Sequence, residues 1–246
     1  MSKQKNRDEL NIHKSAAMTK VEQLVTELIE SEDPVLMGKA DKLCYWLEDW
    51  IKFLAFEPQF QPMKLRRYKR GEIIKVHLGF NIGSEEGGLH YAVVLDKNNA
   101  KSSPVITVVP LTSVKPNTDI ESLKGGRVFL GNELFTCLNA KITASSQHLS
   151  GTIKLIKDQL ISGNANSEEL NANLKAMIVE NSSLEKMRKE ITKMKKGSIA
   201  LTSQITTISK IRVYDPKSDY DILSGIKLSN EKLDLIDNEI KKNYLK

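Results

Sequence analysis

KRGEIIKVHL (residues 69–78) and YAVVL (residues 91–95) decide the fold of this chain, because each has the pattern of a β-strand. In the first segment apolar residues alternate with polar ones at Ile74, Val76 and Leu78, as in a strand with one buried face. The second segment is a short apolar run that ends in the turn signal DKNN. The sequence therefore predicts a strand, a loop and a second strand.

The loop between these segments combines a flexible backbone with reactive side chains. It contains GSEEGGLH at residues 83–90, with three glycines and two carboxylates. Glycine lets a backbone approach a ligand closely, and Ser84 and His90 can donate and accept protons. The loop is therefore the first candidate for a functional site.

The composition is that of an ordinary globular protein. Of the 246 residues, 40% are hydrophobic and 28% are charged, which allows one large domain or two small ones with a real core. No apolar run approaches the roughly 20 residues that cross a bilayer. The polar start of the chain also lacks the apolar segment of a secretory signal. We therefore expect a cytoplasmic protein with no membrane partner.

The two cysteines, Cys44 and Cys137, lie far apart in apolar contexts, and the chain has no C-x-x-C motif or Cys/His cluster. This pattern argues against a structural zinc site and predicts two reduced thiols in the core. The sequence thus predicts neither a metal ion nor a cofactor.

Helical segments precede and interrupt the predicted strands. Apolar residues recur at helical spacing on both sides of the breaker SEDP, which predicts an N-terminal helical hairpin within residues 1–62. A second helical region is predicted at residues 132–196. Its last helix, residues 167–194, carries apolar residues spaced by sevens at Leu170, Met177, Leu184 and Ile191. We expect this helix to pack on the preceding one or on the hairpin; a dimerisation arm is the alternative.

Three motifs, in the same order along the chain, resemble those of the MazF/PemK family of toxin endoribonucleases from bacterial toxin–antitoxin modules. They are R-G-E-I-x-x-V-x-L-G-x-x-x-G-S-E-E-G-G at residues 70–88, SPVITVVPLTS at residues 103–113, and S-x-x-x-x-x-Q-I-x-T-I-x-K-x-R at residues 198–212. A final helix, capped by Ser229, is also similar to one in the family.

The resemblance implies an α+β fold built on a small SH3-like, partly open β-barrel. The first part of the barrel is expected at residues 63–131, and the second part, with the C-terminal helix, at residues 197–246. The N-terminal helical hairpin and the inserted helical lobe would then decorate this barrel.

The resemblance also implies a reaction. Members of the family cut single-stranded RNA without a metal: the ribose 2′-hydroxyl attacks the adjacent phosphate, leaving a cyclic phosphate and a 5′-hydroxyl. On this interpretation the chain is an endoribonuclease toxin that acts on single-stranded RNA, chiefly mRNA. A protein antitoxin would neutralise it, and the expected homodimer would bind RNA in a groove spanning both subunits.

Two residues stand at the family's catalytic positions. The family pattern pairs an arginine after the glycine loop with a threonine at the end of the third strand, and here these positions hold His90 and Thr112. Two interpretations stay open. In one, His90 transfers protons, as histidine readily does near neutral pH, while Thr112 and Ser84 hydrogen-bond the phosphate. In the other, loss of the permanent charge has weakened or abolished cleavage, leaving a protein that binds RNA or an antitoxin.

Four further residues are candidates for contacts with RNA, on the strength of the family pattern: Arg70, Glu85, Gln204 and Arg212. Each also has a simpler interpretation. Glu85 suits a turn, Gln204 suits a solvent-facing strand, and the two arginines suit structural ion pairs.

The net charge of +6 is concentrated in two basic stretches. The first contains Lys64, Arg66, Arg67, Lys69, Arg70 and Lys75, and the second contains Lys186, Arg188, Lys189, Lys193, Lys195 and Lys196. The neighbouring family motifs favour RNA contact for the first stretch only. The alternative is a solvated helix face and a basic linker.

Two other functions remain open. A non-catalytic toxin or regulatory binding module of the same fold would bind nucleic acid, or would poison DNA gyrase as one relative does through its C-terminal helix. A phage-defence or regulatory protein would instead use the helical insertion to sense a partner.

Overall fold

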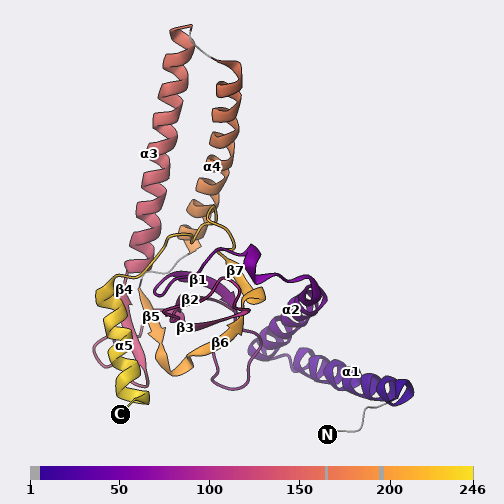
Figure 1. Ribbon diagram of the computed structural model, residues 1–246. Helices are drawn as coiled ribbons and strands as arrows, with labels where there is room; N and C mark the ends of the chain where they lie inside the picture. Colours follow the sequence, from indigo (N-terminus) through magenta and orange to yellow (C-terminus); the bar gives the residue numbers. More distant parts are fainter. Residues whose placement is uncertain (1–5, 164–165, 194–196, 246) are drawn as a thin grey trace.

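The computed structural model describes residues 6–163, 166–193 and 197–245, in which helices project from a central β-sheet in two directions (Figure 1). The strands are β1 (Ile73–His77), β2 (Leu89–Val94), β3 (Val105–Ser113), β4 (Arg127–Gly131), β5 (Ser198–Leu201), β6 (Thr206–Ser209) and β7 (Val213–Asp215). The helices are α1 (Arg7–Glu30), α2 (Pro34–Phe56), α3 (Glu133–Ile161), α4 (Ser167–Lys193) and α5 (Asn230–Tyr244).

The strands that are described form one antiparallel sheet, in the order β4-β5-β3-β2-β1-β7, with β6 also paired to β3. The predicted strand–loop–strand is β1 and β2, whose register runs from Ile73↔Val93 to His77↔Leu89. β3 lies at the centre, with β2 along one edge and β6 and β5 in succession along the other. The predicted α+β class is confirmed.

Both faces of the central strands are buried, because successive side chains of a strand point to opposite sides. Ile73 and Val93 pack in a cluster with residues of α5, whereas their neighbours Ile74 and Ala92 pack in a second cluster on the other face. The sheet therefore supports two apolar layers, and it holds the loop between β1 and β2 on a rigid base.

The two N-terminal helices form where expected, and they contact each other. Asn6 caps α1, and the side chain of Asp33 caps α2 by accepting a hydrogen bond from the backbone of Val35. No residue of α1 is buried, and Figure 1 shows α1 pointing away from the sheet while α2 runs back toward it. The second half of α1 contacts α2, where Val21, Val25 and Leu28 are half-buried and Ala40 of α2 is buried. The predicted N-terminal helical hairpin stays a prediction.

Helices α3 and α4 lie side by side as a long arm that stands on the sheet (Figure 1). Leu138, Leu149, Leu184 and Met187 form a small core between the two helices. The expectation that the second helix of the insertion packs on the preceding one is thus confirmed. The predicted last residue of this helix, Met194, lies outside the described residues.

The base of the arm is tied to the sheet by polar contacts. Glu190 of α4 accepts hydrogen bonds from Lys75 of β1 and Tyr91 of β2. Lys141 of α3 donates to three backbone carbonyl oxygens, those of Asp221, Ile222 and Ser224, at 2.8–3.1 Å. The arm therefore joins the sheet as a fixed element rather than as a loose insertion.

At the other end of the sheet, Ser229 caps α5 as predicted, because its hydroxyl accepts a hydrogen bond from the backbone of Lys232 at 3.3 Å. Leu228 and Leu233 are buried in the cluster beneath this helix.

The two cysteines are free, but only one is in part buried. Cys137 is half-buried, whereas Cys44 is exposed because its side of α2 faces solvent, contrary to the expectation of two core thiols. None of the described helices is both long and apolar enough to cross a lipid bilayer.

Candidate functional site

The loop between β1 and β2 is a tight structure that only glycine permits at two positions. The backbone amide of Gly88 donates to the carbonyl oxygen of Gly79 at 2.7 Å, and the amide of Leu78 donates to the carbonyl oxygen of Gly88 at 2.7 Å. A Cβ on Gly87 would lie 2.9 Å from the Gly79 oxygen, and Gly79 itself has a φ of +99°. The glycines therefore fold the loop back on itself beside β2.

His90 lies at the end of this loop, with a hydrogen-bond acceptor at each ring nitrogen. Its Nδ1 is 3.2 Å from the carbonyl oxygen of Leu111, and its Nε2 is 3.2 Å from Oε1 of Glu86. His90 therefore stands between a backbone carbonyl and a carboxylate, at the position where the family resemblance implies an arginine.

Thr112 lies beside His90. β2 pairs with β3 at Ala92↔Pro110, and continuing this antiparallel register by two residues sets His90 opposite Thr112. The contact of the His90 ring with the carbonyl of Leu111 agrees with this placement. Thr112 is half-buried at the end of β3. The fold thus places near each other the two residues that the resemblance makes candidates for catalysis.

Gln204 holds the glycine loop in place through two hydrogen bonds to its backbone. Its Oε1 accepts a hydrogen bond from the backbone amide of Glu86 at 3.3 Å, and its Nε2 donates to the carbonyl oxygen of Ser84 at 3.2 Å. The side chain of Gln204 is therefore held by the loop and is not free in solvent, which contradicts the simpler interpretation. It fixes the loop that carries Glu86 toward His90.

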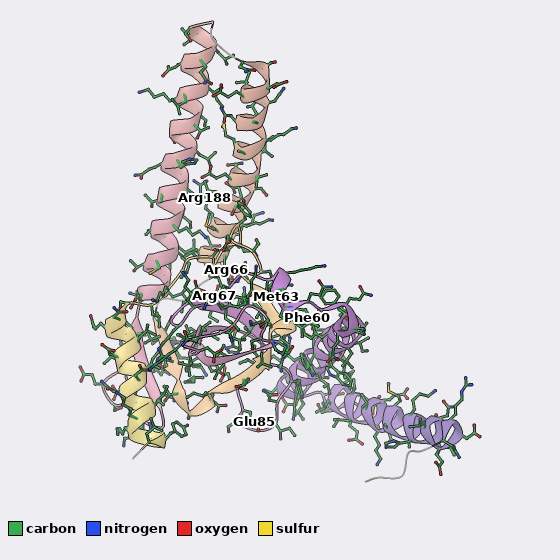
Figure 2. All side chains as sticks on the ribbon, viewed as in Figure 1. Phe60, Met63, Arg66, Arg67, Glu85 and Arg188 are labelled. Atoms are coloured by element: carbon green, nitrogen blue, oxygen red, sulfur yellow. The ribbon has the colours of Figure 1, made fainter. Side chains whose placement is uncertain are left out.

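Ser84 and Glu85 occupy the exposed part of the loop. Figure 2 shows Glu85 on the side of the sheet away from the α3–α4 arm. The structure therefore offers both residues to a ligand, although neither touches the ring of His90.

Arg212 and His77 form the other border of the site. The Nε of Arg212 donates to the carbonyl oxygen of His77 at 2.7 Å, and the guanidinium lies 5.5 Å from the centre of the Trp46 ring. The His77 ring stacks on Trp46, with 4.7 Å between ring centroids. These contacts join α2 to the sheet at the edge of the loop.

Burial shifts the pKa of His77 at this border of the site. Burial lowers the pKa of His77, and the positive charges of Arg212 and His90 act in the same direction, whereas Asp49 opposes them. The neutral ring fits its contacts, because its Nδ1 accepts a hydrogen bond from the backbone amide of Gly79 at 3.0 Å. His77 is thus a neutral structural residue at the border of the site.

Two clefts open on either side of the loop. The first has a volume of about 410 Å³, and its lining includes Asn81, Glu85, Glu86, Gln204 and Arg212. The second has a volume of about 580 Å³, and its lining includes Lys39, Lys42, Tyr45 and Trp46 of α2 together with His77 and His90. Glu85 lines both clefts, so an extended ligand crossing the loop would pass from one to the other.

Arg70 lies elsewhere. It hydrogen-bonds to the carbonyl oxygen of Leu95 and forms an ion pair with Asp237 of α5, and it lines neither cleft. These contacts support the simpler interpretation of Arg70 as a structural ion-pair partner.

Half of the first basic stretch forms ion pairs within the fold. Arg66 bonds to Glu72 and Asp219, and Lys75 bonds to Glu190. In Figure 2, Arg66 and Arg67 lie near the base of the arm, far from Glu85. This stretch therefore does not border the loop. In the second stretch Arg188 pairs with Glu185, while Lys195, Lys196 and the side chain of Lys193 lie outside the described residues.

The sequence did not single out Glu86 or the α2 residues of the second cleft. Glu86 precedes His90 by four residues in the quoted motif, but two carboxylates stand side by side there and the pattern does not tell which one turns inward. The α2 residues carried no local signal, because their role depends on a helix docking against a distant loop.

The assembled groups suit proton transfer and anion binding. The site offers a carboxylate, an imidazole and a threonine hydroxyl beside open clefts. Within the described residues, no group of three or more His, Cys, Asp or Glu side chains is arranged to hold a metal ion.

A comparison with known protein families supports the resemblance. Residues 69–155 match the family described as a PemK-like, MazF-like toxin of a type II toxin–antitoxin system. The match contains the glycine loop, His90 and Thr112, and it runs into α3, beyond the predicted start of the insertion. A search among curated proteins found no match.

Proposed function

We propose that this chain, whose residues 69–155 match the PemK/MazF toxin family, is a toxin that cleaves single-stranded RNA without a metal ion. The observation that carries the proposal is the pair of His90 and Glu86, 3.2 Å apart and each lining an open cleft. Extending the printed register of β2 and β3 sets Thr112 opposite His90. Three kinds of group needed for RNA cleavage thereby meet at one place.

The reaction needs a base for the 2′-hydroxyl, an acid for the leaving oxygen and donors for the phosphate. Glu86 is placed to accept the proton of the 2′-hydroxyl as that oxygen attacks phosphorus. The imidazolium of His90 is placed to give a proton to the 5′-oxygen as the P–O bond breaks. Thr112 and Ser84 then hydrogen-bond the phosphoryl oxygens, and the products are a 2′,3′-cyclic phosphate and a 5′-hydroxyl.

The clefts supply a path for RNA. Glu85, Gln204 and Arg212 line the first cleft and are the proposed RNA contacts there. Arg70 was the fourth candidate, and its ion pair with Asp237 leaves it out of this path.

The resemblance to the family also suggests the fold, the cellular location and the partners of the protein. The sheet, with both faces of its central strands buried, fits a small SH3-like, partly open barrel. We propose that the toxin acts in the cytoplasm on mRNA, forms a homodimer and is neutralised by a protein antitoxin.

Expression of the unmodified chain in a bacterial host tests the proposal, alongside His90→Ala and Thr112→Ala. We expect growth arrest and RNA fragments ending in cyclic phosphate, with cleavage reduced at least about 100-fold in both variants. His148→Ala and Thr143→Ala, on the exposed surface of α3, are the matched controls and should cleave normally.

A second function is favoured by one observation: a histidine stands where the family resemblance implies an arginine. A non-catalytic module that binds nucleic acid or gyrase would not need this residue for chemistry. Growth arrest that persists in both variants, with RNA intact, would establish this alternative and exclude the nuclease.

A further inference from the structure

The second cleft is built from two parts of the chain that are distant in sequence. One wall is the glycine loop with His77 and His90, and the other is the face of α2 that carries Lys39, Lys42 and Tyr45. Residues 34–56 of α2 lie outside the region that matches the toxin family. This wall is therefore an addition of this chain to the proposed site.

The position of α2 is fixed by contacts on the same helix. Trp46 stacks on His77 at 4.7 Å between centroids and receives the guanidinium of Arg212 at 5.5 Å. One turn further, Oδ2 of Asp49 lies 3.9 Å from Nε2 of His77. The cleft is thus formed before a ligand binds. Binding would therefore not carry the entropic cost of ordering the helix.

The α2 face turned to the cleft carries positive charge and an exposed ring. Lys39, Lys42 and Tyr45 are spaced by three, so they follow one another along one side of the helix. Among the described residues neither lysine forms an ion pair, and Tyr45 is 64% exposed. The wall therefore presents two free cations and one free aromatic face.

These groups match the repeating chemistry of a single-stranded polynucleotide. Lysines neutralise backbone phosphates, and an exposed aromatic ring stacks an unpaired base with little regard to sequence. The cleft also contains His90, so its occupant must continue into the place where the scissile phosphate is proposed to lie. A strand of RNA meets both conditions.

We infer that α2 is an RNA-binding wall of the site, on which Tyr45 stacks a base next to the cleaved bond while Lys39 and Lys42 hold the adjoining phosphates. The inference rests on the proposed ribonuclease function. On this inference, residues of α2 contribute to substrate affinity, whereas residues of the glycine loop and β3 carry out the reaction.

The test measures binding and cleavage of a fluorescent, random-sequence, single-stranded RNA of about 12 nucleotides, a length within the range of single-strand sites. Cleavage kinetics compare the unmodified chain with Tyr45→Ala, Tyr45→Phe and Lys42→Gln. Binding is measured by fluorescence anisotropy in a His90→Ala background, which prevents turnover. Tyr220→Ala and Lys20→Gln are matched controls, since both residues are exposed and outside the two clefts.

We expect Tyr45→Ala to weaken binding and raise KM about tenfold, with kcat within about twofold and Tyr45→Phe restoring most of the affinity. Lys42→Gln should weaken binding and reduce the slope of log affinity against log salt by about 0.7. Affinity and KM equal to those of the controls would overturn the inference while leaving the nuclease intact. An unmodified chain that neither binds nor cuts RNA would overturn the proposed function, and the inference with it.

Discussion

Tyr91, the residue next to His90 in β2, donates a hydrogen bond to Glu190 at the base of the α3–α4 arm. Burial, followed by the hydrogen bond to Glu190 and the negative charge of that residue, raises the pKa of Tyr91 well above its usual value, so the phenol remains a donor at all ordinary pH. Lys75 donates to the same carboxylate, which thereby links two strands of the sheet to the arm.

Removal of this carboxylate should destabilise the fold. Glu190→Ala leaves a largely buried lysine and a buried phenol without their shared acceptor, and we expect a loss of roughly 2–4 kcal/mol in the free energy of unfolding. Urea denaturation measures the change. Glu185→Ala is the matched control: its ion pair with Arg188 is about half exposed, and the loss should stay below about 0.5 kcal/mol. Equal losses in the two variants would contradict this role of Glu190.

Glu86 should affect turnover rather than substrate affinity. Glu86→Gln keeps the shape of the side chain but removes both the charge beside His90 and the proposed base, so we expect kcat to fall about 100-fold. Steady-state cleavage of single-stranded RNA gives the two constants. Glu85→Gln, at the adjacent exposed position, should change KM more than kcat. A normal kcat for Glu86→Gln would remove Glu86 from the proposed mechanism.

The anchor of α2 should contribute measurable stability. Trp46→Ala removes the stacking on His77 and the contact with Arg212, and we expect a loss of about 2 kcal/mol in the free energy of unfolding. Trp50→Ala, four residues along the same helix and 46% exposed, should cost less than about 1 kcal/mol. The RNA-binding wall should loosen with Trp46→Ala only, which a parallel rise in KM would report.

His77 should make stability depend on pH. Burial lowers its pKa below the 6.5 of an unperturbed histidine, so the unfolded chain takes up the proton first as the pH falls. The contribution of the neutral ring is therefore complete above pH 6.5 and is lost as the pH falls through the folded-state pKa. Between pH 7 and roughly 5, His77→Gln should show a smaller fall in melting temperature than the unmodified chain. His13→Gln on exposed α1 should keep the original slope, and identical slopes in all three proteins would refute the role of His77.

Local patterns were enough to locate most of the sheet. The alternation at Ile74 and Val76 and the apolar run before the turn DKNN are properties of consecutive residues, and they placed β1 and β2 within a few positions. Ser229 was likewise recognisable as the cap of α5. The resemblance to a family added the expectation that His90 and Thr112 meet, which a single strand pattern does not contain.

Contacts between distant segments could not be predicted in the same way. The partner of Arg70 is Asp237, which follows it by more than one hundred and sixty residues, and no local pattern favours that pairing over RNA contact. The choice of Glu86 over Glu85 as neighbour of His90 depends on the folded-back glycine loop and on Gln204. The position of α2 depends on the surface that Trp46 contacts, and that surface is on β1.

The position of the arm in the chain has a consequence for synthesis on the ribosome. β3 lies at the centre of the sheet, yet β5 and β6, which complete one of its edges, are translated only after both arm helices. Gln204, which fastens the glycine loop, arrives equally late. At roughly 5–20 residues per second, a nascent chain holds β1 to β4 for several seconds with β3 unpaired on that side. If the proposed ribonuclease function holds, the glycine loop would therefore reach its final geometry only when translation is nearly finished.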